Sequence, residues 1–201
     1  MTYRPSSARG AHQERESLVD AAWRHIAAHG TDLSDSLTIE QIAADAGVSV
    51  GRLRHHFPTG PDLALGVVDL LYSRMMALCL RYTDGWNTRQ QAQVTWRSFV
   101  HDVSSLGIGD IFARITSETV RDLGPELRSA VLPRQQRMNR EIEAVLKRSR
   151  NHGLITDNIT GPSFLMGIAM ISRPVPTLPE SMNQRQRGWL TDIYLRGMRP
   201  E

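Results

Sequence analysis

The segment GVSVGRLRHHF, residues 47 to 57, gathers four basic side chains in a short stretch of expected helix. The guanidinium groups of Arg52 and Arg54 can each donate two hydrogen bonds to a guanine edge or a phosphate. The imidazoles of His55 and His56 can reach phosphates or single acceptors. Because the segment holds no acidic residue, we predict that these side chains face solvent or an anionic partner.

The acids nearest in sequence to this cluster are Asp45 and Asp62. Residues 1 to 62 contain six arginines and eight acids, so this part of the chain is not basic overall. Any signal for nucleic-acid binding therefore lies in the placement of the arginines and not in their number.

Other patterns that could support chemistry are weak. His25 and His29 have a four-residue spacing that could hold a metal ion, but no third ligand lies nearby in the sequence. We interpret both as packing residues and expect neither a metal nor a cofactor. The chain has no GxSxG or HExxH motif, so we expect that it is not an enzyme, with an enzyme of unfamiliar design as an alternative.

Composition indicates a globular protein. Of the 201 residues, 40% are hydrophobic, which is enough for a substantial core, and the net charge is +3. No apolar run is long enough to span a bilayer. The first thirteen residues are polar and no apolar segment of a secretory signal follows them, so we expect a cytoplasmic protein. Cys79 is the only cysteine and is interpreted as a small core residue.

Apolar residues recur with a helical period along almost the whole chain, and no hairpin signal occurs, so the predicted fold class is all-α. The predicted helices are residues 13–29, 39–46, 50–56, 61–81, 88–105, 109–122, 125–151, 162–172 and 181–197. The segment RPVPTLPE, residues 173–180, is predicted to be a link without helix because of its prolines.

Two of the short helices have strong start signals. Thr38 is the expected cap of the second helix, with Gln41 completing a capping box, and Ser49 is the expected cap of the third. With the glycine-containing turn between them they predict a helix-turn-helix. We therefore divide the chain into a flexible arm (1–13), a DNA-binding domain (14–62) and a larger helical domain (63–201).

The stretches LVDAAWRHIAAHG and LTIEQIAADAGVSVGRLRHHFPTGPDLALGVV resemble the tetracycline-repressor (TetR) family of transcriptional regulators. This resemblance implies a homodimer on a palindromic operator of double-stranded DNA, released by an unknown small-molecule effector. Two positions depart from the family, which commonly has an aromatic residue at Arg54 and a lysine at Gly60. The implied DNA contacts are Thr38, Ser49, Val50, Gly51, Arg52, Arg54, His55, His56 and Thr59.

Helical geometry separates the two arginines of the recognition helix. Arg52 lies nearly opposite the face formed by Leu53 and Phe57, so we expect it to reach base edges. Arg54 lies at the flank, where a phosphate is the nearer target. Gly51 lacks a side chain and lets the helix approach the bases closely.

The larger domain carries methionines and aromatic residues on several helices. Most of them must form the core, but such residues also line adaptable apolar pockets between helices. A domain that binds a protein partner and no small ligand is the alternative. The candidate pocket residues are Met75, Cys79, Trp96, Phe99, Phe112, Ile115, Thr116, Met138, Phe164 and Met170.

The last two helices fit a dimer contact, in which two copies form a four-helix bundle. Packing within one chain is the alternative. Glycine would permit close approach and the apolar residues would supply buried area. The candidate interface residues are Phe164, Gly167, Ile168, Ile171, Trp189, Leu190 and Ile193.

Overall fold

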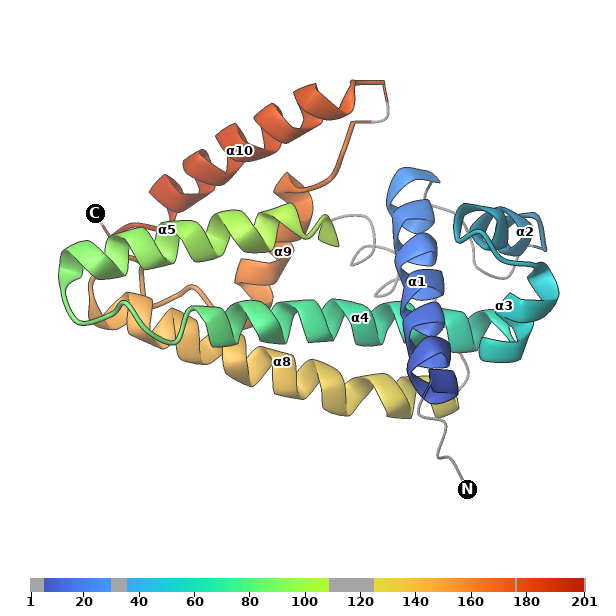
Figure 1. Cartoon of the computed structure of the whole chain (residues 1–201). Helices are drawn as coiled ribbons and strands as arrows, with labels where there is room; N and C mark the ends of the chain where they lie inside the picture. The colour runs from blue at the N-terminus through green and yellow to red at the C-terminus, as the bar shows by residue number, and fades with distance from the viewer. Residues whose placement is uncertain (1–5, 30–35, 109–124, 176, 201) are drawn as a thin grey trace. The chain divides into compact units, whose positions relative to one another are not determined.

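The computed structural model describes residues 6–29, 36–108, 125–175 and 177–200 (Figure 1). These residues contain eight helices and no strand, which confirms the predicted all-α class. The helices are α1 (Ser6–His29), α2 (Ser36–Asp45), α3 (Val50–His56), α4 (Gly60–Arg81), α5 (Arg89–Ser105), α8 (Pro125–Asn151), α9 (Gly161–Ile171) and α10 (Glu180–Gly197).

The helix bounds follow the local signals closely, with two differences near the N-terminus. α1 begins at Ser6, inside the segment expected to be a flexible arm, because the helical hydrogen bonding continues through that polar sequence. α2 begins at Ser36, so Thr38 lies within its first turn and not at its cap. The predicted helix at 109–122 lies outside the described residues.

The chain forms two compact units, Met1–Leu70 and Leu71–Glu201, which we describe separately. In the N-terminal unit, α2 packs against both α1 and α3. Its core contains Leu18, Ala22, Ile42, Leu53, Phe57, Leu63 and Val67, each at most 2% exposed. The division falls inside α4, eight residues beyond the domain boundary expected after Asp62, so that boundary stays a prediction.

A glycine lets α4 approach the rest of the N-terminal core. A Cβ atom added to Gly66 would lie 2.9 Å from Phe57 Cε1 and 3.1 Å from Val19 Cγ2. Those distances leave no space for a methyl group, so α4 carries glycine where it contacts α1 and the end of α3.

In the C-terminal unit, α5 packs on α9 and α10, and α9 also packs on α8. Aromatic rings join these helices: the Phe164 ring lies 5.6 Å from Trp96, 6.1 Å from Phe99 and 6.2 Å from Tyr194, centroid to centroid. Phe164, Phe99 and Trp96 are at most 4% exposed. This cluster is the centre of the unit's core.

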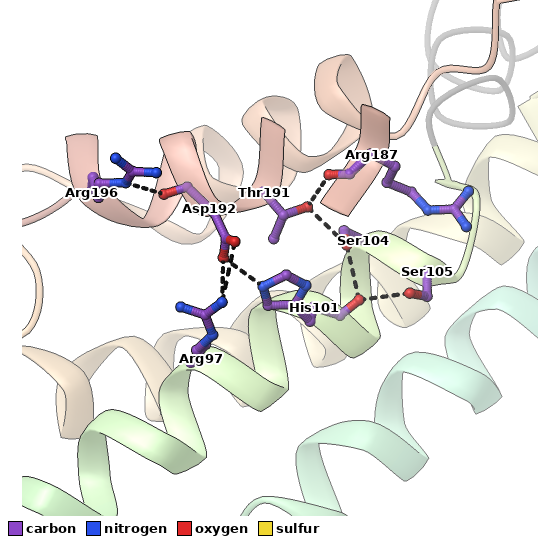
Figure 2. Close-up of polar contacts among 8 residues, drawn as sticks. All are labelled: Arg97, His101, Ser104, Ser105, Arg187, Thr191, Asp192 and Arg196. Atoms are coloured by element: carbon purple, nitrogen blue, oxygen red, sulfur yellow. Dashed lines mark hydrogen bonds and ion pairs between the residues drawn. The ribbon is translucent and has the colours of Figure 1, made fainter. Parts of the chain in front are cut away.

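Polar contacts add to this packing where α10 lies across α5 (Figure 2). The Asp192 carboxylate is 2.9 Å from both His101 Nε2 and a terminal nitrogen of Arg97. Nearby, the buried Thr191 hydroxyl donates to Ser104 Oγ at 3.1 Å. Because these groups are satisfied across the helix pair, they fix how α10 is rotated against α5.

The link between α9 and α10 is held by one buried side chain. Asn183, 9% exposed, accepts from the Val175 amide at 2.9 Å and donates to the carbonyls of Val175 and Leu178 at 3.2 and 3.1 Å. These bonds satisfy backbone groups that no helix uses. The described residues of 173–179 are not helical, as predicted, whereas Glu180 is the first residue of α10.

By length and composition, α4 is the one described helix that could cross a membrane. The sequence prediction of a helix at 61–81 considered only the shorter apolar run inside it and therefore did not identify it as a candidate membrane span. Half of the apolar window is buried inside the protein. Such a helix is equally typical of a protein core.

Candidate nucleic-acid interface

The turn between α2 and α3 sets the position of α3. Gly47 has φ +70°, a left-handed conformation that glycine adopts without strain, and it ends α2. The Val48 amide donates to the Ala43 carbonyl at 3.0 Å, which closes the turn. Ser49 then caps α3, because its hydroxyl accepts from the Arg52 amide at 3.3 Å. The expected helix-turn-helix and the Ser49 cap are both present.

The two faces of α3 differ sharply. Leu53 is 1% exposed and Phe57, just after the helix, is 2% exposed, so both lie in the core of the N-terminal unit. Arg52, Arg54 and His55 are exposed. The apolar face therefore anchors the helix, and the basic side chains remain accessible.

Arg52 has an acidic partner that the sequence did not reveal. Its Nε and one terminal nitrogen donate to the two carboxylate oxygens of Glu14 on α1, the second bond being 2.8 Å long. His56 Nε2 lies 3.5 Å from the same carboxylate. The expectation that the cluster lacks an acidic partner is thus wrong for Arg52 and His56, because folding brings α1 beside α3.

This contact changes the titration of Glu14. Hydrogen bonding from Arg52 lowers the pKa of Glu14 to about 2 from an ordinary value of 4.5, and His56 contributes in the same direction. The pKa of Arg52 is raised by the same hydrogen bond. Both groups are charged at neutral pH, so the pair contributes no net charge to the surface of α3.

The remaining positive charge on α3 belongs to Arg54, with His55 beside it. Within the described part of the chain, neither residue has an ion pair or side-chain hydrogen bond. The His55 ring meets the edge of His56 at 5.6 Å between centroids. Arg54 is therefore the arginine of α3 that is free for an anionic partner.

Three other residues predicted to contact DNA differ in their surroundings. Thr59 caps α4: its hydroxyl and amide donate to the Asp62 carboxylate at 2.6 and 3.0 Å, and its hydroxyl accepts from the Asp62 amide. The neighbouring carboxylate would repel a phosphate at Thr59. Gly51 is exposed and a Cβ atom there would meet nothing within 4 Å, so packing within the chain does not require glycine. Val50 is half-buried at the start of α3.

Sequence reasoning missed two residues of α1 near this site. One is Glu14. The other is Arg15, whose guanidinium carbon lies 4.8 Å from the centre of the Phe57 ring, a cation–π contact that covers the end of α3. Only the crossing of α1 and α3 brings these residues together, and no local motif marks it. His25, considered above as a metal ligand, is buried with Nδ1 3.7 Å from the Asp45 carboxylate.

The predicted ligand-pocket residues in the C-terminal unit are mostly closed core. Those with exposures of 4% or less are Met75, Cys79, Trp96, Phe99, Met138 and Phe164. Burial raises the pKa of the Cys79 thiol to about 11, in keeping with a structural cysteine. Met170 is 68% exposed and is therefore not part of the core. Phe112, Ile115 and Thr116 lie outside the described residues.

The structure does contain a cavity, in a different place. It has a volume of about 520 Å³ and lies between the first half of α5, the end of α10 and the turn after α8. Of the predicted pocket residues, only Trp96 lines it. The lining residues are Arg89, Gln93, Trp96, Arg97, Gly153, Leu154, Asp192, Leu195, Arg196, Arg199 and Pro200.

The predicted dimer residues divide into buried and exposed groups. Phe164 and Ile168 are fully buried by the chain's own helices, so they offer no surface to a second copy. Gly167 does permit a close approach, but within the chain, because the Tyr194 ring of α10 lies against it. Trp189 and Ile193 are 62% and 42% exposed. Ile171 and Leu190 are half-buried.

No protein-family model and no curated protein sequence matches the chain. Solved structures do match it. The ketosteroid transcriptional regulator KstR2 of Mycobacterium tuberculosis is similar over 98% of both chains, with a TM-score of 0.60 and 18% identity. The TetR-family regulator PfmR from Thermus thermophilus is similar over 92% of this chain and 96% of its own, with a TM-score of 0.58 and 15% identity.

A third similar structure is the transcriptional regulator FadR from Bacillus subtilis in complex with stearoyl-CoA. It has a TM-score of 0.53 and 18% identity, and the match covers 90% of this chain and 96% of FadR. The chain therefore has the fold of TetR-family transcriptional regulators. The fold implied by the resemblance of residues 14 to 68 is confirmed along nearly the whole chain.

Proposed function

We propose that this protein is a cytoplasmic, DNA-binding transcriptional regulator, a homodimer that a small ligand releases from a palindromic operator. One observation carries the proposal: in a helix-turn-helix, α3 is anchored by Leu53 and presents Arg54 and His55 outward without an acidic partner among the described residues. Such a helix lies in the major groove, with nearby basic side chains on the phosphates.

The two arginines of α3 have different roles in this proposal. Glu14 holds the Arg52 guanidinium in a fixed position, which orients it toward a base edge but also reduces its attraction to phosphates in general. Arg54 supplies the sequence-independent attraction. Gly51 leaves the backbone of α3 bare where the helix would approach the bases.

Two copies of α3 are needed because a single short helix contacts too few base pairs for tight binding. Apolar side chains exposed on α9 and α10 support a dimer through these helices. Met182, Trp189 and Ile193 lie on one face of α10, at spacings of seven and four residues. Met166 and Met170 are exposed one turn apart on α9. Together they are the surface that a second copy would cover.

Sedimentation can test the dimer with a matched pair of variants. Ile193→Asp places a charge in the proposed contact, and Val94→Asp places the same charge at a 63% exposed position on α5 outside it. We expect Ile193→Asp to yield monomers at micromolar concentration and Val94→Asp to remain dimeric, since burying an unpaired charge is costly. A dimeric Ile193→Asp protein, or a monomeric wild type, would contradict the proposed interface.

Release by a ligand follows from geometry. Half-sites are spaced by about 34 to 36 Å, one turn of DNA, so a shift of a few ångströms between the two α3 helices prevents both from binding. The ligand can shift this equilibrium only by its difference in affinity for the two arrangements. The structure of FadR with stearoyl-CoA supports a small ligand in this fold.

The DNA-binding part of the proposal is tested by measuring how the affinity for a double-stranded DNA that the wild type binds changes with salt concentration. Arg54→Ala removes the proposed phosphate contact, whereas Arg185→Ala removes an exposed arginine of α10. We expect Arg54→Ala to weaken binding to all sequences and to reduce the slope of log affinity against log salt by about two per dimer. Equal effects of the two variants would show that α3 does not contact the phosphates.

A further inference from the structure

The cavity beside α5 and α10 is lined mainly by positively charged side chains. Four arginines line it, Arg89, Arg97, Arg196 and Arg199, together with one acid, Asp192. Its volume of about 520 Å³ is within the range of small-molecule sites, roughly 300 to 1,000 Å³. The concave shape distinguishes this cluster from a flat strip of surface arginines.

The one acidic residue of the cavity already has basic partners within the chain. The Asp192 carboxylate is 2.9 Å from His101 Nε2 and 2.9 Å from a terminal nitrogen of Arg97 (Figure 2). These contacts lower the pKa of Asp192, the hydrogen bond from His101 being the largest cause, so the carboxylate is ionised at neutral pH. The Arg196 charge also helps to lower the pKa of Asp192, so a single carboxylate faces the four arginines of the cavity.

Arg89, Arg196 and Arg199 form no direct ion pair with an acid in the described part of the chain. Arg196 donates its Nε to the backbone carbonyl of Asp192 at 3.4 Å, which leaves its terminal nitrogens available. Arg89 and Arg199 have no side-chain hydrogen bond or ion pair with a described residue. These side chains are exposed, so water and salt weaken their mutual repulsion, but several positive charges around one cavity still attract an anion.

Helix dipoles explain only part of this arrangement. Arg196 is in the last turn of α10 and Arg199 follows the helix, positions at which a positive charge is favourable. Arg89 is the first residue of α5, where the helix end is itself positive and a cation is unfavourable. A bound anion would offset both that repulsion and the clustering of the arginines.

The wall of the cavity also contains a buried donor without an acceptor. Trp96 is 4% exposed, and its indole Nε1–H makes no hydrogen bond in the structure. A buried indole N–H usually has a partner, since an unmade hydrogen bond of this kind costs free energy. The protein itself covers this nitrogen, so a ligand in the cavity would contact other parts of the Trp96 side chain.

We infer that this cavity binds a small molecule carrying at least two phosphate or carboxylate groups, held by Arg89, Arg196 and Arg199. Guanidinium groups suit either anion, because their paired N–H donors match the spacing of two oxygens. This site shares only Trp96 with the predicted apolar pocket, and anion binding here does not depend on the proposed DNA binding.

Calorimetric titration with inorganic pyrophosphate and with citrate tests the inference, at an ionic strength held constant with sodium chloride. We expect saturable binding of one of the two anions, and the comparison distinguishes a phosphate site from a carboxylate site. The indole N–H resonance that Trp96→Phe removes should shift on binding. If neither anion binds saturably to the wild type, the inference is overturned.

Two arginines of α10 provide a matched control. Arg185 and Arg196 are both exposed and each donates its Nε to the carbonyl four residues earlier at 3.4 Å, but only Arg196 lines the cavity. We expect Arg196→Ala and Arg199→Ala to weaken anion binding at least tenfold and Arg185→Ala to leave it unchanged. Equal weakening by Arg185→Ala would mean that only overall charge attracts the anion, which contradicts a site.

Further readouts separate this inference from the proposed function. The Cys79 thiol, which is buried, should stay unreactive toward a thiol reagent in every folded variant. Arg54→Ala should lose DNA affinity and keep anion binding. If Arg199→Ala instead lowers DNA affinity as much as Arg54→Ala and pyrophosphate does not bind, the arginines contact nucleic acid and the small-molecule site is refuted.

Discussion

The Arg52 guanidinium on α3 is bonded through two nitrogens to the Glu14 carboxylate on α1, although 38 positions separate the two residues in sequence. The contact ties the proposed recognition helix to the helix that supports it. It also places a negative charge beside a surface that would approach DNA. We therefore propose that Glu14 both orients Arg52 and opposes indiscriminate attraction to phosphates.

Glu14→Gln should raise affinity for every DNA sequence and reduce discrimination between operator and unrelated DNA. The reason is that Arg52 would gain a full net charge and lose its fixed position. The measurement is the ratio of operator to random-duplex affinity. Glu16→Gln makes the same charge change at an exposed site on α1 and is the control. Equal ratios for the two variants would refute an orienting role for Glu14.

The same ion pair predicts how stability depends on pH. Because the pKa of Glu14 is lowered from 4.5 to about 2 in the folded protein, its contribution to stability is present above pH 4.5 and is lost as the pH falls toward 2. Urea unfolding should show wild type more stable than Glu14→Gln at pH 6. This advantage should shrink between pH 4.5 and pH 2. An advantage that does not change with pH would contradict the lowered pKa.

Gly51→Ala should change stability and DNA affinity in opposite directions. Alanine favours helix over glycine by roughly 0.5 to 1 kcal/mol, and a Cβ atom at Gly51 meets nothing in the chain. We therefore expect a higher melting temperature and weaker operator binding, because the methyl group would hold α3 away from the bases. Unchanged affinity in the stabilised variant would show that Gly51 does not face DNA.

Two glycines near the C-terminus should respond to alanine in opposite ways. At Gly167 a Cβ atom would overlap the Tyr194 ring, whose hydroxyl donates to the Phe164 carbonyl at 3.1 Å, so Gly167→Ala must displace the Tyr194 side chain or move α10 away from α9. Overpacking of this kind costs about 1 to 3 kcal/mol. Gly188→Ala, on α10 with nothing within 4 Å, should stabilise the protein slightly. Equal unfolding free energies for both variants would contradict the close packing of α9 on α10.

Local signals were enough to predict the bounds of the recognition helix. Ser49 caps it and Pro58 follows its end, so both limits of Val50–His56 could be read directly from the sequence. The partner of Arg52 could not be predicted, because Glu14 becomes a neighbour only through the crossing of α1 and α3. Pairing between distant helices leaves no periodic trace in the sequence.

The predicted interface shows a second limit of sequence reasoning. α9 is apolar on nearly every side, so its periodicity does not show which face the chain itself covers. Phe164 and Ile168 face inward while Met166 and Met170 are exposed, a division set by the packing of α5, α8 and α10 around α9. The arginines of the cavity were not predicted either. They lie up to 110 residues apart in sequence, from Arg89 to Arg199, and only the packing of α10 on α5 brings them together.

Selection of bound fragments from genomic DNA tests the central claim most directly. Wild-type protein should enrich one two-fold symmetric sequence whose half-sites lie about one DNA turn apart. A variant with Arg54→Ala and His55→Ala should lose that enrichment while its urea unfolding curve matches that of the wild type, which shows that both units are folded. Enrichment of no sequence by the wild type, or of the same sequence by the variant, would contradict DNA recognition through α3.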